Sequence, residues 1–294
     1  MIYVHAAGCH NSMPSGGLSD LKSELKTLCG RSFRRIDRFI MLALIGAHKA
    51  VGGHELEPDT ALYLTSGQGD IPVFERVRRQ RYFQKMMSKP VDFVNLASNT
   101  AGFYVASHLG LDGANLFLAH HRFPVQMVLL LAQSELELKR HPAILLGGVD
   151  EWLENQVLAR KLLGVSEFAE LGEGSNWLLL RREAAGALGG IYADPRRYDR
   201  AQLQRRISRL EPGTLLAFSR PLPAALRAEL TGLRGDLQLF DGEDSGAYYE
   251  TRLLHVINRF LHDPAASAGL FHIDGDGDYF MTSTVVVGQW ARIN

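Results

Sequence analysis

The chain has 294 residues, 46% of them hydrophobic and 22% charged, with 32 Lys and Arg residues balancing 32 Asp and Glu residues. These values are typical of a folded globular protein and exclude intrinsic disorder, collagen and coiled coil. Zero net charge removes the electrostatic case for nucleic acid or an anionic membrane as the main partner. Two cysteines cannot build a disulfide framework or a four-cysteine metal site. We therefore expect a reduced, cytoplasmic protein without a targeting segment or a membrane span.

Apolar periodicity predicts alternating strands and helices in the first part of the chain. Ile2–Ala7 is a first strand, Arg34–Val51 has the 3.6-residue period of a buried helix, and Thr60–Thr65 is a buried strand that ends in a glycine-rich loop. The basic stretch Arg76–Lys89 favours a solvated amphipathic helix over an anion-binding patch. We further predict helices over Ala97–Leu109 and Pro124–Lys139 and strands over Leu116–Ala119, Ala143–Gly148 and Asn176–Arg181.

The same alternation continues more loosely in the second part of the chain. The pattern predicts helices over Arg200–Leu210, Ala224–Gly232 and Tyr248–Leu261, and strands over Thr214–Phe218, Leu237–Phe240 and Thr282–Val287. This order indicates a layered α/β architecture with helices on both faces of the sheets. The composition changes at Ala184–Gly190 and no Pro/Ser-rich linker follows, so we expect two α/β halves in one compact unit.

Glycine-rich motifs occur in a distinctive order within the first 185 residues. They are a turn after a helix (Gly110, Leu111, Gly113, Asn115), a strand end (Gly147, Gly148, Asp150) and a loop before a strand (Leu171 to Gly174). Together they resemble the central segment of the β-ketoacyl synthases of the thiolase fold. Ala114 stands where that family usually has proline. The resemblance is good over residues 1–185 and weak beyond.

The resemblance implies a thiolase-like α-β-α-β-α layered fold of two pseudo-repeated halves. Residues 1–185 would form the ketosynthase N-terminal-like half and residues 186–294 a shortened C-terminal-like half. The family's nucleophilic cysteine, at the start of a buried helix, falls at Arg122, and arginine cannot act as a thiolate. The first assisting histidine falls at Asp241, and the glycine-rich oxyanion loop falls at Gly275–Asp278. The second histidine lies in a region that this chain omits.

Loss of the whole catalytic set resembles a chain-length factor. We predict a non-catalytic subunit of a β-ketoacyl synthase in fatty acid, polyketide or aryl polyene biosynthesis, which shapes the acyl tunnel of its partner. That partner is a catalytic ketosynthase or a second copy of this chain, and acyl carrier protein is an indirect partner. The strand Asn115–Ala119 is expected to pair across the dimer axis, so that proline at Leu116 or Leu118 would dissociate the dimer. The pocket and interface candidates are Asn115, Phe117, Ala119, His120, His121, Arg122 and Phe123.

Other kinds of site fit the sequence less well. His120, His121 and His141 have no carboxylate or cysteine at ligand spacing, and the acidic stretch that starts at Asp274 lacks the glutamate of a calcium loop. Cys9 and Cys29 are expected to be small packing residues, so we predict no metal and no cofactor. Two alternatives stay open. One is an active acyltransferase or ketosynthase with His120 or His121 as base, and the other is a self-associating ligand-binding scaffold.

Overall fold

The structure is a computed structural model of the chain and describes residues 1–13, 18, 20–30, 32–219, 222–240, 247–263, 269–275 and 278–287. Its strands are β1 (Ile2–Ser12), β2 (Ala61–Thr65), β3 (Asn115–Leu118), β4 (Ile144–Asp150), β5 (Glu173–Arg181), β6 (Gly189–Ala193), β7 (Leu215–Phe218), β8 (Gln238–Leu239), β9 (Leu270–Gly275) and β10 (Phe280–Val287). Its helices are α1 (Leu21–Cys29), α2 (Arg38–Val51), α3 (Ile71–Arg78), the π-helical turn η2 (Arg79–Phe83), α4 (Pro90–Asn95), α5 (Thr100–Leu109), α6 (Pro124–Glu137), α7 (Gln156–Leu163), α8 (Arg200–Ile207), α9 (Ala224–Gly232) and α10 (Arg252–Leu261).

The described strands form one mixed sheet whose order repeats itself. The order is β3-β2-β4-β5-β1-β6-β10-β9-β7-β8, so that β8-β7-β9-β10-β6 repeats β3-β2-β4-β5-β1. In each set the fourth strand, β5 or β10, is antiparallel to its neighbours and the other pairs are parallel. The two sets join where β1 pairs antiparallel with β6. The first and second halves named below are the segments that carry β1–β5 and β6–β10.

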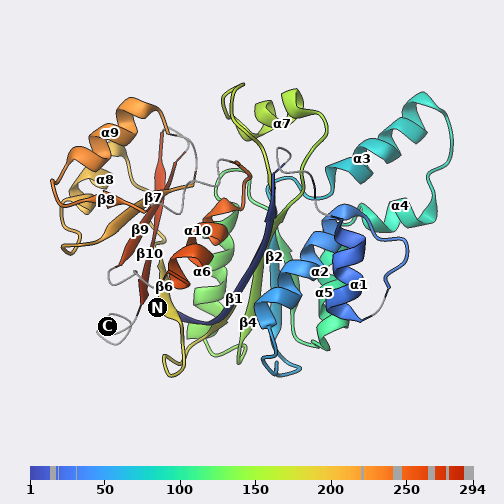
Figure 1. Ribbon diagram of the computed structural model, residues 1–294, viewed down its shortest axis with the longest axis horizontal. Coiled ribbons are helices and arrows are strands. Elements are labelled where there is room, and N and C mark those ends of the chain that lie inside the picture. Colours follow the sequence, from blue (N-terminus) through green and yellow to red (C-terminus); the bar gives the residue numbers. More distant parts are fainter. Residues whose placement is uncertain are drawn as a thin grey trace.

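Helices lie on both faces of each half, which produces five layers (Figure 1). α6 and α10 lie in the middle between the two sets of strands, and their apolar side chains belong to one large core that both halves share. α1, α2 and α5 cover the outer face of the first half through a second core. α8 and α9 cover the outer face of the second half through a third core. Among the described residues, no helix is long and apolar enough to cross a membrane.

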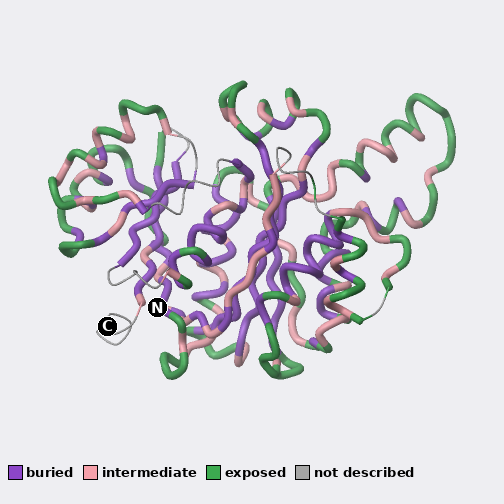
Figure 2. The backbone as a smooth tube through the Cα atoms, in the orientation of Figure 1, coloured by how far each residue is buried: buried purple, intermediate pink, exposed green. Residues whose placement is uncertain are grey.

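The central strands are buried on both faces, so their alternate side chains enter different cores (Figure 2). In β2, Leu62 and Leu64 point to the outer core, whereas Tyr63 points to the shared core. The two glycines near the end of β4 follow from the same alternation. A Cβ on Gly147 would lie 2.5 Å from the Trp177 ring, and a Cβ on Gly148 would lie 2.8 Å from side-chain atoms of α10 and of the residue before it. The glycine pair therefore permits close packing on both faces.

Local causes explain where the structure departs from the predicted elements. α2 begins at Arg38 rather than Arg34, because Asp37 is still in an extended conformation. The basic stretch predicted as one helix divides into α3, η2 and an irregular segment in which Lys85 has a φ of 54°. The sequence patterns missed α1, α4, α7, β6 and β9. β6 begins with two glycines, which in the sequence indicated a break. In the structure Gly189 is needed for close strand packing, because a Cβ there would lie 2.5 Å from a carbonyl oxygen of β10.

Candidate functional site at the start of helix α6

His120 stabilises the turn that leads into α6. Its Nδ1 atom accepts hydrogen bonds from the backbone N–H groups of Arg122 (3.3 Å) and Phe123 (3.1 Å). Acceptance at Nδ1 assigns the proton of the neutral ring to Nε2. Burial, with a smaller effect of Arg197 and His121, lowers the pKa of His120 and favours this neutral form. Nδ1 of His120 is therefore occupied by the turn, and its Nε2 atom is a hydrogen-bond donor.

The other candidates are close in sequence, but their surroundings in the structure differ. Phe123 is 2% exposed and stacks on His120 with ring centroids 6.4 Å apart. Phe117 packs partly against the outer core of the first half. Asp241, the position of the first family histidine, lies outside the described residues. The exposed candidates are Asn115, Ala119, His121 and Arg122.

The strand before α6 is an edge of the sheet. β3 pairs with β2 in parallel on one side and ends the strand order there. The N–H of Leu62 in β2 donates to the carbonyl of Ala114, so the backbone groups of Leu116 also face β2 and those of Asn115 and Phe117 face outward. The N–H groups of Leu116 and Leu118 therefore face β2, and Phe117 is the position whose N–H faces outward; dissociation of a dimer by proline at Leu116 or Leu118 stays a prediction.

Two carboxylates link the halves at the starts of the central helices. Asp150, at the end of β4, accepts hydrogen bonds from the Ser66 hydroxyl (2.8 Å), the Gly67 N–H (2.8 Å) and the Thr251 N–H (2.7 Å). Thr251 precedes α10 of the other half. Conversely, Asp274 of β9 accepts a 2.8 Å bond from the side chain of Gln126 in the first turn of α6. Each half thus fixes the central helix of the other.

Glu173, at the start of β5, gathers the segments around the same end of the first half. Its carboxylate is fully buried and pairs with the guanidinium of Arg38, the first residue of α2. It also accepts from the Ser12 hydroxyl (2.6 Å) at the end of β1 and from the Trp152 N–H (3.3 Å) after β4. A buried carboxylate is tolerated when a cation and several donors surround it. The motif Gly172 to Gly174 therefore has a structural role, because Glu173 connects α2, β1 and the segment after β4.

A second pair of acidic side chains lies nearby with few donors. Asp70, just before α3, and Glu151, just after β4, interact through their charges, and each carboxyl group has a buried oxygen without a hydrogen-bond partner, Oδ2 of Asp70 and Oε1 of Glu151. Burial raises the pKa of Asp70 to about 6, and burial together with the charge of Asp70 raises the pKa of Glu151 well above its usual range. The pair therefore holds a proton near neutral pH that isolated carboxyl groups would lose.

The second half contains a buried Ser–His pair that sequence patterns did not reveal. The Ser219 hydroxyl, just after β7, lies 2.6 Å from Nε2 of His272 in β9. Burial lowers the pKa of His272 to about 3, so the ring is neutral. Such a pair is one element of a nucleophilic site. His272 is fully buried and Ser219 is 3% exposed, so the pair packs the interior and offers no access to a substrate. Ser219 and His272 are 53 positions apart in the sequence, so no local motif reveals the pair.

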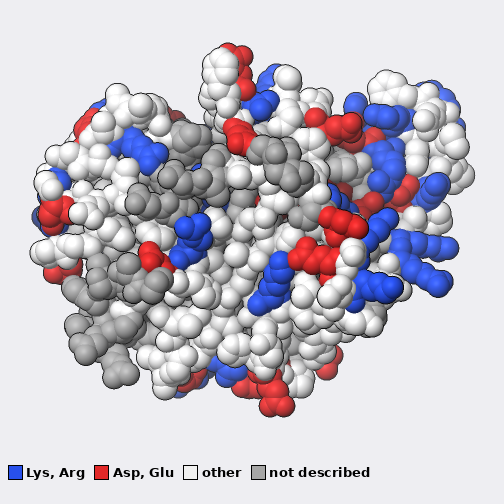
Figure 3. Space-filling view, viewed as in Figure 1, with Lys and Arg blue, Asp and Glu red and all other residues white. Residues whose placement is uncertain are grey.

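Two exposed surfaces have compositions suited to partners. The arm of α3, η2 and α4 projects from the first half and carries large exposed apolar side chains beside basic ones (Figures 1 and 3). The large exposed apolar residues there are Phe74, Tyr82, Phe83, Met86, Met87, Phe93 and Val94. In the second half, a groove of about 550 Å³ along α8 is lined by Arg196, Arg197, Tyr198, Gln202, Arg205, Arg206 and Arg209. Guanidinium groups at this density favour an anionic ligand.

No sequence-family profile matches the chain, and no curated protein matches it by sequence. Among solved structures, the ishigamide ketosynthase/chain length factor is similar over 98% of this chain and 99% of its own, with a TM-score of 0.74 and 14% identity. A type II polyketide acyl carrier protein complex with its ketosynthase (AntDE:AntF) gives 0.67 at 10% identity, over 98% and 99%. The ketosynthase ApeO with its chain length factor ApeC from Xenorhabdus doucetiae gives 0.57 at 12% identity, over 96% and 98%. These likenesses confirm the thiolase-like fold of ketosynthases and chain length factors.

Proposed function

We propose that this chain is a non-catalytic, chain-length-factor-like subunit that pairs with a catalytic β-ketoacyl synthase. The observation that carries the proposal is the start of α6, where the open edge strand β3 leads to His120–Phe123 and not to a thiol. The likeness to ketosynthase and chain length factor complexes supports it. In this proposal residues 1–185 and 186–294 are the two ketosynthase-like halves, and the protein acts in the cytoplasm.

The chemistry around α6 argues against acyl transfer by this chain. A thiolate nucleophile would gain from the positive end of a helix dipole, but the two cysteines lie elsewhere, on β1 and at the end of α1. Burial raises the pKa of Cys9, which disfavours its thiolate. His120 uses Nδ1 to accept backbone hydrogens, so its ring is not free to take a proton there. The alternative of an active enzyme with His120 as base is therefore weaker.

The proposed contact with the ketosynthase runs along β3 and the neighbouring arm. The outward backbone groups of Asn115 and Phe117 can continue the sheet into a partner strand. Leu116 on β3 and Phe103 on the adjoining helix α5 are 43% and 62% exposed. Leu116 lies on the face of this edge that carries α6 and Phe103 on the outer face, so a protein partner that packs against the edge can cover both. By closing this side of the ketosynthase, the chain would limit the length of the ketosynthase's acyl tunnel.

The arginine groove along α8 is the second contact that we include. An acyl carrier protein carries an acidic surface and a phosphopantetheine phosphate, which guanidinium groups bind well. Arg205 and Arg209 are exposed on the groove, and Arg196 is held at its rim by bonds of 3.0 and 2.9 Å to Asp194. The groove would attract the carrier protein toward the complex without transferring the acyl group itself.

Co-expression with the ketosynthase encoded beside it tests the proposal. We expect a one-to-one complex that survives size-exclusion chromatography with light scattering. The matched control is a ketosynthase from an unrelated pathway, which should elute separately. A chain that binds neither ketosynthase and assembles only with itself would support the self-associating scaffold and contradict the proposal.

Intact mass spectrometry tests the absence of catalysis. The purified chain is incubated alone with acyl-CoA and then with acylated carrier protein. We expect no covalent acyl adduct and no condensation product, whereas the ketosynthase in the complex should acquire the acyl group. A stable adduct on this chain, or turnover by it alone, would establish the enzyme alternative instead.

A further inference from the structure

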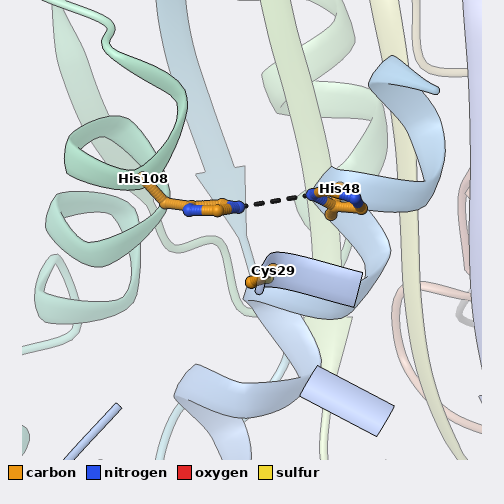
Figure 4. Close-up of side chains that lie close together, drawn as sticks. All are labelled: Cys29, His48 and His108. Carbon is orange, nitrogen blue, oxygen red and sulfur yellow. Dashed lines mark hydrogen bonds between the residues drawn. The ribbon is translucent and has the colours of Figure 1, made fainter. Parts of the chain in front are cut away.

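A cysteine and two histidines meet on the outer face of the first half, in the layer of α1, α2 and α5. Cys29 ends α1, His48 lies near the end of α2 and His108 near the end of α5. One ligand atom of each residue lies within 4.8 Å of those of the others, and all three residues are half-buried. Figure 4 shows the two imidazole rings pointing toward each other with Cys29 beside them. The three residues share no sequence motif.

The distance between the two imidazoles fits a shared metal ion. Nδ1 of His48 and Nε2 of His108 are 3.3 Å apart. Zinc–nitrogen bonds of about 2.0–2.1 Å at tetrahedral angles place two nitrogens about 3.3 Å apart. Without a metal, one imidazole can donate a hydrogen bond to the other across this gap. When a metal ion binds, the donor ring keeps its proton on its other nitrogen, and the Cys29 thiol, after a small rotation of its side chain, releases its proton to solvent and becomes a thiolate ligand.

The backbone around the three residues favours a positive ion. Each of the three lies in the last turn of its helix, and each helix ends at a glycine in the left-handed conformation, namely Gly30, Gly52 and Gly110. Helix carboxyl ends carry partial negative charge, so three that meet at one point stabilise a cation there. The nearby Lys49 is directed away from the group, since its ammonium pairs with Glu24 at 2.6 Å. The Phe33 ring, 5.8 Å from that of His108, helps to hold His108 in place.

We propose that Cys29, His48 and His108 form a binding site for a zinc-like transition metal ion. One thiolate and two imidazoles suit zinc and its neighbours among the transition metals, and not magnesium or calcium, which prefer oxygen ligands. Three protein ligands leave the fourth tetrahedral position for water or another small donor. Half-burial of the group gives an ion a path of entry.

The site would fasten α1 to the scaffold. α1 packs on α2 and has no counterpart among the described residues of the second half, where the outer layer consists of α8 and α9. A metal ion would connect its last residue to two histidines that lie 19 and 79 residues later in the chain. The site lies in the outer layer, whereas the start of α6 lies in the central layer, so the inference stands independently of the proposed function.

Cobalt(II) is a suitable probe because tetrahedral thiolate coordination gives it a near-ultraviolet charge-transfer band and strong visible bands. Untagged protein is stripped with a chelator and titrated with cobalt, and zinc then displaces the cobalt in competition with a chromophoric chelator. We expect one equivalent per chain, with both kinds of band, and a higher melting temperature on zinc addition.

Substitutions distinguish this site from nonspecific metal binding. Cys29→Ser should abolish the charge-transfer band, and Cys29→Ser, His48→Gln and His108→Gln should each lower zinc affinity by at least about tenfold. Cys9→Ser and His54→Gln are matched controls, which should bind as the unmodified chain does. Absence of stoichiometric binding to the unmodified chain would overturn the proposal. So would a thiolate band that survives Cys29→Ser or disappears in Cys9→Ser.

Discussion

The two halves of this protein share a strand order but differ in what covers it. In the first half, α2 lies between the sheet and α1, and 11 of its 14 residues are buried. In the second half, α8 occupies the corresponding outer position without such a cover, and only Leu203 and Ile207 of its eight residues are buried. The exposed face of α8 is accordingly rich in arginine. A helix can be apolar on all sides only when protein surrounds it.

The additional elements of the first half also carry most of the features that we associate with function. The α3–α4 arm, the edge strand β3 with its neighbour α5, and the Cys29, His48 and His108 group all belong to it. The second half contributes β9 and α10, which fix the centre of the molecule, and the arginine groove. The comparison indicates that the repeated sheet is a scaffold and that the insertions between its strands distinguish the two halves.

The largest effect is expected from breaking the link between the halves at Asp150. Asp150→Ala leaves the Ser66 hydroxyl and the N–H groups of Gly67 and Thr251 buried without their acceptor. We expect a loss of about 3 kcal/mol or more in the free energy of unfolding, measured by urea denaturation. The control Asp112→Ala, at an exposed position, should change it by less than about 0.5 kcal/mol. Equal effects of the two substitutions would mean that Asp150 does not hold the halves together.

The edge strands of the two halves should respond differently to a new charge. Leu116→Lys in β3 places an ammonium on the proposed interface, so we expect loss of the ketosynthase complex in light scattering with little change in melting temperature. The matched control is Gln238→Lys in β8, the edge strand at the other end of the sheet, which should leave the complex intact. Phe117→Pro removes an outward N–H and should also dissociate the partner. An intact complex with both β3 variants would place the interface elsewhere.

The acidic pair of the first half makes stability depend on pH. The pKa of Asp70 is about 6 in the folded protein against 3.8 for an ordinary aspartate, so the folded state holds a proton that the unfolded chain has lost between these values. Stability is therefore expected to fall as pH rises through this window, by up to about 3 kcal/mol. Glu151→Gln removes the acidic neighbour of Asp70 and should flatten the pH dependence, whereas the exposed Glu154→Gln should not. Urea denaturation at pH 4 and pH 7 measures the stability of both variants, and the same pH dependence in both would contradict the role of the acidic pair.

The smallest effect is expected at the arginine groove, which should alter binding without altering the fold. Arg205→Glu combined with Arg209→Glu reverses two exposed charges, and we expect affinity for acyl carrier protein to fall about tenfold at low salt. The control is Arg81→Glu combined with Lys85→Glu on the arm, which changes the net charge by the same amount. Titration calorimetry with the ketosynthase complex measures both. A greater loss from the arm variants would move carrier protein binding to the first half.

The sequence predicted much of the scaffold, because strands and helices leave patterns among residues that are close in the chain. The apolar runs of β2, β4 and α6 and the glycine pair at Gly147 and Gly148 were visible as patterns, and the ketosynthase resemblance placed them in order. The same reasoning failed for β6, whose glycines indicate a break unless the neighbouring strand is known. It also could not show which N–H groups of β3 face outward, since only the register with β2 decides this.

The sequence by itself determined the layered α/β class and the likeness to ketosynthases, because periodicity and motif order are properties of neighbouring residues. Only the tertiary structure decided the crossed contacts of Asp150 and Asp274, the proximity of Asp70 to Glu151, and the meeting of Cys29 with two histidines. Those contacts join residues from distant segments. Packing of the layers sets their distances, and hence their chemistry.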